Sequence, residues 1–171
     1  MIRPIRKIGD PILRRRAKKV EKITKDTQRL IDDMIETMRA AHGLGLAAPQ
    51  IGVSERIAIV EVEQDDANPG DSKLHVLINP EVLRVSEETW EHVEGCLSIP
   101  GWRGDVVRPV RVTVRATDRE GKRFTLDAEG MLARAILHEV DHLDGVLYID
   151  RLVAPDRIWR VDEEALIAAK R

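Results

Sequence analysis

The sequence predicts one domain built from both helices and strands. Its 171 residues are enough for a single domain with a substantial hydrophobic core. Apolar residues recur with helical spacing near the start of the chain and again toward its end, whereas the middle alternates apolar and polar residues as strands do. We therefore expect residues 1–171 to form one domain of mixed class, with helices before and after a run of strands.

The composition is that of an ordinary soluble globular protein, with 43% hydrophobic and 34% charged residues. The formal net charge of −2 gives no general attraction to nucleic acid or to an anionic membrane. No stretch approaches the ~20 apolar residues of a membrane span, and the start of the chain lacks the apolar core of a secretory signal. A single cysteine, Cys96, allows no intrachain disulfide. These features predict a cytoplasmic protein whose thiol stays reduced.

The first predicted helix spans residues 24–42. Residues 1–22 before it form a basic segment without interleaved aromatic residues, which favours a solvated, extended arm over a nucleic-acid contact. Thr24 or Asp26 is a candidate N-cap of the helix, and Gly43 is a candidate for the residue that ends it. One apolar stripe follows the helical spacing: Leu30, Ile31, Met34, Ile35 and Met38.

Residues 43–50, with the sequence GLGLAAPQ, predict a close approach of the backbone to a ligand. A dinucleotide-binding loop is excluded, because the third glycine of that fingerprint is missing and the segment follows a helix instead of a strand. A plain turn between a helix and a strand is the alternative. Gln50 favours a functional site, since it is a lone polar amide at the end of this segment.

The middle of the chain predicts several strands. Residues 56–62 are mostly apolar and indicate a central strand, residues 64–73 an acidic loop, and residues 75–78 a second strand that ends at Asn79. A third strand runs from about residue 82 toward residue 90. Further predicted elements are a hairpin of residues 110–117 and 124–128, a helix over 129–143, and an amphipathic helix over 155–170.

The helix over 129–143 carries the strongest functional signal, the sequence HEVDH at residues 138–142. Positions i and i+4 share one helix face, so His138 and His142 can direct both imidazoles at one metal ion. Glu139 is rotated by about 100° from His138, so it can lie beside the ion without binding it. The helix is apolar over most of its circumference, which predicts burial, and buried polar groups need partners. A metal ion supplies them.

Two candidates for the third metal ligand remain open on the residues alone. Cys96 would complete a set of three protein ligands with one open position, as in catalytic zinc sites. Glu163, 21 residues after His142, matches the spacing of metallopeptidases with a downstream glutamate ligand. A non-catalytic metal-binding module is a further alternative. We also expect Arg103 and Arg108 to pair with acids such as Glu94 or Asp141.

Three segments taken together resemble one family, the peptide deformylases. Residues 43–50 (GLGLAAPQ), 94–98 (EGCLS) and 138–145 (HEVDHLDG) match the three motifs of that family in order and at suitable separation. The chain length and the order of helices and strands agree as well. One position departs from the family pattern: Leu137 stands where the family usually carries glutamine.

The resemblance implies an α+β fold in which β-sheets, antiparallel or mixed, pack around a central metal-binding helix, with one helix toward each end of the chain. The implied activity is removal of the N-terminal formyl group from formyl-methionine of newly made proteins. The implied cofactor is one divalent ion, typically Fe²⁺, with Zn²⁺, Ni²⁺ or Co²⁺ also bindable. The implied partner is the nascent formylated polypeptide, and the resemblance allows a transient contact with the ribosome.

The resemblance also implies roles for single residues. Cys96, His138 and His142 would bind the ion, and Glu139 would be the general acid/base that serves a water attacking the formyl carbonyl. The Gln50 amide and the Leu97 backbone N–H would stabilise the oxyanion, with Gly45 close by. We expect Gly45, Leu46 and Leu97 to surround the formyl group closely, and Leu44, Met131 and Ala135 to line a pocket for the methionine side chain. The full set of residues expected to bind substrate is Leu44, Gly45, Leu46, Glu94, Arg103, Met131 and Ala135.

Overall fold

The computed structural model describes residues 1–63 and 72–169, and these residues adopt the expected α+β fold. A five-stranded sheet has the order β1-β2-β3-β6-β7, a three-stranded sheet has the order β4-β5-β8, and neighbouring strands in both are antiparallel. The helices are α1 (Lys25–Ala40), α2 (Gly130–Leu143) and α3 (Glu163–Ala169), with short 3-10 helices η1 (Pro11–Arg14), η2 (Ala48–Ile51) and η3 (Tyr148–Arg151). The strands are β1 (Gly45–Ala47), β2 (Ile57–Glu63), β3 (Ser72–Val85), β4 (Thr89–Cys96), β5 (Ile99–Pro109), β6 (Arg111–Thr117), β7 (Arg123–Glu129) and β8 (Ile158–Arg160).

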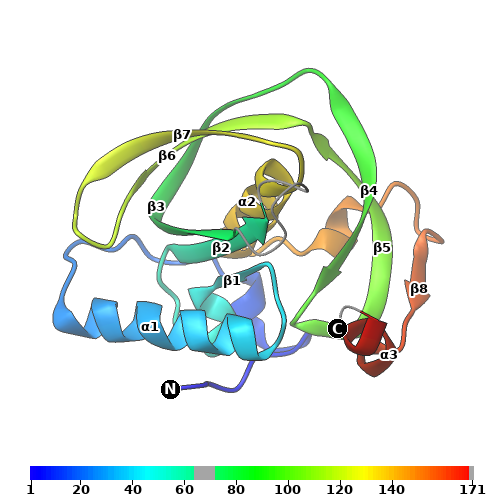
Figure 1. The fold of residues 1–171 in the computed structure, drawn as a ribbon, viewed down its shortest axis with the longest axis horizontal. Helices are drawn as coiled ribbons and strands as arrows, with labels where there is room; N and C mark the ends of the chain where they lie inside the picture. Colours follow the sequence, from blue (N-terminus) through cyan, green and yellow to red (C-terminus); the bar gives the residue numbers. More distant parts are fainter. Residues whose placement is uncertain (64–71, 170–171) are drawn as a thin grey trace.

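Helix α2 lies in the middle of the molecule, as Figure 1 shows, with the strands of both sheets curving around it. One face of α2 packs on the five-stranded sheet through a cluster that includes Val60, Val114 and Ile136. Helix α1 packs on the opposite face of this sheet through a second cluster, in which Ile31 and Met34 meet Ile57 and Ile59 of β2. The HEVDH motif therefore lies on α2, which has more buried residues than either other α-helix of the described ranges. None of the helices in the described ranges is long and apolar enough to cross a membrane.

Helix α1 begins as the sequence predicts and ends differently. The Thr24 hydroxyl accepts a hydrogen bond from the Thr27 amide at 3.3 Å, and the Thr27 hydroxyl accepts one from the Thr24 amide at 3.0 Å. The residue in the left-handed conformation after the helix is His42, with φ 55°, and not Gly43. Gly43 is small for another reason, since a Cβ there would lie 2.7 Å from Leu97 Cδ1.

Strand β3 corrects the prediction of two separate strands around Asn79. It runs through from Ser72 to Val85, with a register irregularity between Ile78 and Glu81 in its pairing to β6. Asn79 adopts a φ of 50°, and its side chain donates to the Val20 carbonyl and accepts from the Val20 amide, both at 2.9 Å. These bonds stabilise a bend instead of ending the strand. Of the predicted acidic loop 64–73, residues 64–71 lie outside the described residues.

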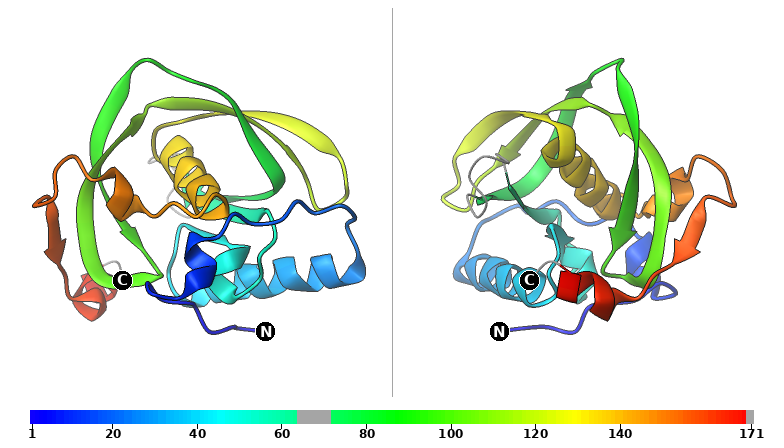
Figure 2. Two further views of the ribbon diagram at one scale, coloured as in Figure 1. Left: turned by 180° about the vertical axis from the view of Figure 1, so that it is seen from behind. Right: turned by 45° about the vertical axis from the view of Figure 1, so that its right-hand side comes forward.

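Two further elements differ from the prediction. Residues 89–109, where no strand was predicted beyond about residue 90, form a long hairpin of β4 and β5, and Cys96 is the last residue of β4. The predicted helix over 155–170 is first a strand, β8, and only then a helix, α3. Strand β8 forms because β5 offers it a free edge, with Arg103 opposite Trp159. Figure 2 shows β8 on the outer side of β5 and α3 near the end of the β4–β5 hairpin.

Candidate metal centre

Helix α2 positions two imidazoles at the centre of the fold. His138 and His142 are one turn apart, and their ring centroids are separated by 5.1 Å. His142 is almost fully buried, and both rings lie toward the inner side of the β4–β5 hairpin. The helical spacing of the sequence therefore gives the arrangement that was expected of it.

Cys96 brings a thiol to the same point. Its Sγ lies 3.2 Å from His142 Nε2, and one donor atom each of Cys96, His138 and His142 fall within 4.8 Å of one another. Burial alone would raise the pKa of the Cys96 thiol, but the imidazoles of His142 and His138 outweigh burial and lower that pKa well below its ordinary value. A buried thiolate between two imidazoles fits a divalent transition-metal ion.

Glu94, in β4, orients the first imidazole. Its carboxylate lies 2.8 Å from His138 Nδ1, which leaves Nε2 of that ring for the metal site. Burial by itself would raise the pKa of Glu94, but hydrogen bonds from His138 and Arg108 lower that pKa far below its ordinary range. Glu94 was expected to bind substrate. Both of its oxygens are bound by protein side chains, and one of these contacts is to the His138 ring.

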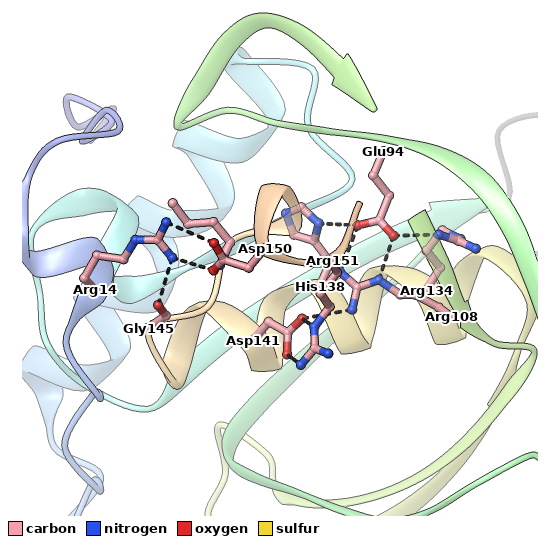
Figure 3. Close-up of polar contacts among 10 residues, drawn as sticks. Arg14, Glu94, Arg108, Arg134, His138, Asp141, Gly145, Asp150 and Arg151 are labelled. Atoms are coloured by element: carbon pink, nitrogen blue, oxygen red, sulfur yellow. Dashed lines mark hydrogen bonds and ion pairs between the residues drawn. The ribbon is translucent and has the colours of Figure 1, made fainter. Parts of the chain in front are cut away.

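A buried network of charges holds Glu94 in place (Figure 3). Arg108 binds both oxygens of Glu94 at 2.6 and 2.9 Å and also reaches Asp141 at 2.9 Å. Arg134 adds a contact of 2.6 Å to Glu94, and Arg151 binds Asp141 from the other side at 2.6 and 3.0 Å. The expectation that Arg108 pairs with Glu94 or Asp141 is confirmed, and it contacts both. Because every carboxylate here meets a guanidinium, the network fixes β4 and β5 against α2.

Glu139 is a buried carboxylate next to the three candidate metal ligands, Cys96, His138 and His142. It is 4% exposed, and among the described residues no donor reaches its Oε2 atom. Burial raises the pKa of Glu139 despite the opposing effect of the two histidines. Gly45 lies directly against it, because a Cβ on Gly45 would be 2.8 Å from Glu139 Oε1. A carboxylate oxygen left without a hydrogen-bond donor from the described residues at this depth fits a role toward a bound ion or water.

Gln50 completes the polar groups around Cys96. Its Oε1 accepts a hydrogen bond from the Ala47 amide at 2.9 Å, which turns its Nε2 toward the site. Nε2 then lies 3.6 Å from Cys96 Sγ and 3.1 Å from Ser98 Oγ. Leu97 lies in the two-residue turn between β4 and β5. The side-chain amide thus presents a fixed donor beside the thiol.

A cavity of about 510 Å³ opens over these groups. Among the residues expected to bind substrate, Leu46 is the one that does not line it, because its side chain is fully buried in the cluster beneath α1. Arg103 lines the cavity, but it pairs with Glu163 and not with Glu94 or Asp141. The expected residues that do line it are Leu44, Gly45, Gln50, Glu94, Cys96, Leu97, Arg103, Met131, Ala135, His138 and Glu139.

The sequence reasoning missed several residues of the site. Ser98 holds the Gln50 amide, Arg134 is fully buried on α2 and stacks over Trp90 at 4.7 Å, and Lys7 lines the cavity from the N-terminal arm. A signal existed for Arg134, because a charged residue on an otherwise buried helix requires an opposite charge. Leu137, where the family usually carries glutamine, is partly buried and packs on the apolar cluster of the large sheet.

Comparisons with known proteins find similarity to peptide deformylases. A model of the polypeptide deformylase family matches residues 2–157. The peptide deformylase of Halothermothrix orenii is 49% identical over 162 residues, which cover 95% of this chain and 97% of that protein. The crystal structure of peptide deformylase from Thermotoga maritima is 40% identical with a TM-score of 0.82, covering 90% of this chain and 99% of that one. A Met-Ala-Ser-bound structure of a class I type b peptide deformylase from Acinetobacter baumannii is 36% identical with a TM-score of 0.82, covering 89% and 99%.

Fold and site together define a metal-dependent hydrolase. Glu163, the rival third ligand, has its carboxylate bound by Arg103, and the thiol of Cys96 lies beside the imidazoles in its stead. With the family model and relatives near 50% identity, the chain belongs to the peptide deformylase family. It is an enzyme that removes the N-terminal formyl group from newly made peptides. The two alternative predictions, a metallopeptidase with Glu163 as its third ligand and a non-catalytic metal-binding module, are therefore wrong.

Proposed function

We propose that deformylation takes place in the cavity beside α2, with Cys96, His138 and His142 as the ligands of one divalent ion. One observation carries this assignment: a thiol 46 residues distant in the sequence lies 3.2 Å from an imidazole of α2. The lowered pKa of the thiol and the Glu94 contact to His138 support the same ligand set. Three protein ligands leave one position for water or substrate.

The proposed chemistry divides between the ion and Glu139. A bound divalent ion supplies Lewis acidity and can lower the pKa of water to about 7. Glu139 accepts the proton of the attacking water and passes it to the departing amine. Its burial beside the proposed ligands supports this role, because its Oε2 atom has no hydrogen-bond donor among the described residues and can take up a proton from water.

Gln50 and Leu97 are proposed to stabilise the oxyanion that forms on the formyl oxygen. The fixed orientation of the Gln50 amide supports its part, since Nε2 is already directed into the site before substrate binds. Leu97 lines the cavity next to the thiol ligand. Loss of one such donor commonly raises the barrier by about 3–4 kcal/mol.

The methionine side chain is proposed to bind among Leu44, Met131 and Ala135, with Gly45 keeping the formyl end narrow. These residues line one continuous cavity with Glu139, which supports the assignment. The related Acinetobacter baumannii enzyme has been solved with Met-Ala-Ser bound, and we propose that this chain likewise accepts residues beyond the methionine. A single methylene discriminates by only about 1–3 kcal/mol, so selectivity for methionine itself should be modest.

The native ion is proposed to be Fe²⁺, with Zn²⁺, Ni²⁺ and Co²⁺ as substitutes. The thiolate ligand makes a ferrous site sensitive to oxygen. Protein purified without oxygen should contain about one iron per chain and lose activity in air in step with thiol oxidation. Stoichiometric zinc with air-stable activity would refute the iron assignment while leaving the ligand set intact.

The ligand set and the role of Glu139 are tested by two substitutions. Glu139→Ala should retain the ion and lose most turnover of a formyl-Met peptide, whereas Cys96→Ala should lose the ion. Cobalt-substituted protein should show a thiolate-to-metal absorption band that shifts when a hydroxamate is added. Loss of the ion from Glu139→Ala, or full activity of Cys96→Ala, would contradict the assignment.

We also propose that residues 1–171 work as one catalytic domain in the cytoplasm, on chains still emerging from the ribosome. The match of the family model to residues 2–157 supports one domain, and the single reduced thiol supports the compartment. Co-sedimentation with ribosomes at low and physiological salt tests the transient contact, which should weaken as salt rises.

A further inference from the structure

The short helix α3 borders the cavity of the metal centre. Glu163, Leu166 and Ile167 line that cavity together with His138 and Glu139. None of the residues of α3 is buried, and Leu166 is 38% exposed. A helix of seven residues is too short to be stable by itself, so contacts with the rest of the fold must hold it. Its apolar side chains therefore lie at the cavity instead of in a core.

The segment before α3 is fixed to β5. Strand β8 pairs with β5, and the Val161 amide donates to the Gly101 carbonyl at 3.0 Å. The Glu163 carboxylate receives two hydrogen bonds from Arg103, at 2.7 and 2.9 Å, and one from the Gly101 amide at 3.1 Å. A bidentate ion pair of this kind fixes direction as well as distance. Glu163 thereby sets where the first turn of α3 lies.

Arg103 connects this anchor to the metal centre. Its side chain lies across Gly95, because a Cβ on Gly95 would be 2.7 Å from Arg103 Cδ, Nε and Cζ. Gly95 is the neighbour of the ligand Cys96, and Arg103 also donates to the Trp102 carbonyl at 2.8 Å. The Arg103 guanidinium and α3 thus form one fixed side of the cavity, which lies against Gly95, the residue before Cys96.

We propose that α3 is part of the peptide-binding surface, and that Leu166 and Ile167 determine which residues are accepted after the formylmethionine. Glu163 is a positioning residue that holds α3 there through Arg103. A cavity of about 510 Å³ lies within the range of pockets that enclose ligands larger than a single residue. A peptide bound by its formyl end at the metal centre leaves the cavity past α3, where two apolar side chains favour apolar residues. This inference rests on the proposed substrate site.

Two substrates separate the metal centre from α3. Formyl-methionine amide ends before α3 and reports on the chemical step, whereas formyl-Met-Ala-Leu extends toward it. The variant Leu166→Ala/Ile167→Ala should lower the ratio of kcat/KM for the tripeptide to that for the amide by about tenfold, chiefly through the KM of the tripeptide. The corresponding ratio for formyl-Met-Ala-Asp should fall less in this variant, because an aspartate as third residue gains little binding energy from an apolar surface.

Glu163→Gln has a matched control in Glu164→Gln, the exposed acid one residue further along α3. Glu163→Gln should lower the same ratio by about threefold and Glu163→Asp should restore part of it, whereas Glu164→Gln should keep it within about twofold. Thermal melting checks that the variants stay folded, as expected from a helix that buries no residue.

An unchanged ratio in the double variant overturns the inference, and so does an equal loss on both substrates, since that places the effect at the metal centre. A wild-type enzyme without activity on either substrate would instead refute the proposed function. A Glu164→Gln ratio that falls as far as that of Glu163→Gln would show that charge on α3, and not its anchoring, is responsible, and would also overturn the proposal.

Discussion

Gly45→Ala tests how tightly the fold positions Glu139. The added Cβ would lie 2.8 Å from Glu139 Oε1, 2.9 Å from Glu139 Cγ and 3.0 Å from the Ile59 carbonyl oxygen. The Ile59 oxygen belongs to the backbone of β2, which pairs with β1 and cannot retreat far. The carboxylate must therefore move. A shift of about 1 Å in a reacting group can lower turnover by about 10²-fold, and overpacking of this kind destabilises by about 1–3 kcal/mol.

The assay compares kcat on formyl-methionine amide, metal content and urea unfolding. Gly43→Ala is the matched control, because its Cβ would meet the end of the Leu97 side chain, 2.7 Å from Cδ1, which can rotate away. We expect Gly45→Ala to keep the metal while kcat falls about 10²-fold, and Gly43→Ala to lose less than about tenfold.

A double-mutant cycle makes the cause explicit. Glu139→Ala removes the Cγ and Oε1 atoms that the new Cβ would meet, so Gly45→Ala should destabilise that background by at least about 0.5 kcal/mol less than it destabilises the wild type. Near-normal kcat in Gly45→Ala, or an equal loss of stability in both backgrounds, would refute the reasoning.

Three further predictions concern stability. Glu94→Gln should destabilise the metal-free protein by about 3–5 kcal/mol at neutral pH, because Arg108 and Arg134 lose their buried counter-charge. Burial alone would raise the pKa of Glu94, yet His138 and Arg108 lower it, so this stabilisation is lost as the pH falls below the ordinary value of 4.5, and the acid limb of urea unfolding should be flatter in the variant. Asn79→Ala should cost about 2–3 kcal/mol and Asn79→Gly less, because both lose the bonds to Val20 but only alanine is strained at positive φ; equal losses would contradict this. Removal of the ion by a chelator should lower Tm, by the equivalent of about 2.7 kcal/mol when the ion had been present at a hundredfold excess over its Kd, and a Tm independent of metal would argue against the site.

Local spacing carried the most reliable predictions. Two imidazoles at i and i+4 share a helix face wherever that helix lies, so His138 and His142 could be paired without tertiary information. The cap at Thr24 and the hairpin of β6 and β7 were readable for the same reason, because neighbouring residues in the chain form them. Cys96 was different. Its residue type left Glu163 open as a ligand, and only the resemblance of three motifs favoured the thiol.

Distant partners were only partly readable from the sequence. Glu94 and Asp141 were expected as acids for both Arg103 and Arg108, but this holds for Arg108 alone, because the acid that each arginine meets depends on which strands and helices are adjacent. Arg108 points inward between Glu94 and Asp141, whereas Arg103, five residues earlier on β5, meets Glu163 60 residues away. Strand β8 was missed likewise, since three residues with no strong pattern become a strand only beside the edge of β5.

The sequence by itself thus determined the helix that carries the histidines and, through three motifs taken together, the family. The tertiary structure alone decided the depth of Glu139 against Gly45, the charge network behind His138 and the placement of α3 at the cavity. The physical reason is the separation along the sequence over which each kind of interaction acts. Helix spacing and caps are set within a turn of chain, whereas burial and ion pairing arise only when segments far apart in the sequence exclude water from one another.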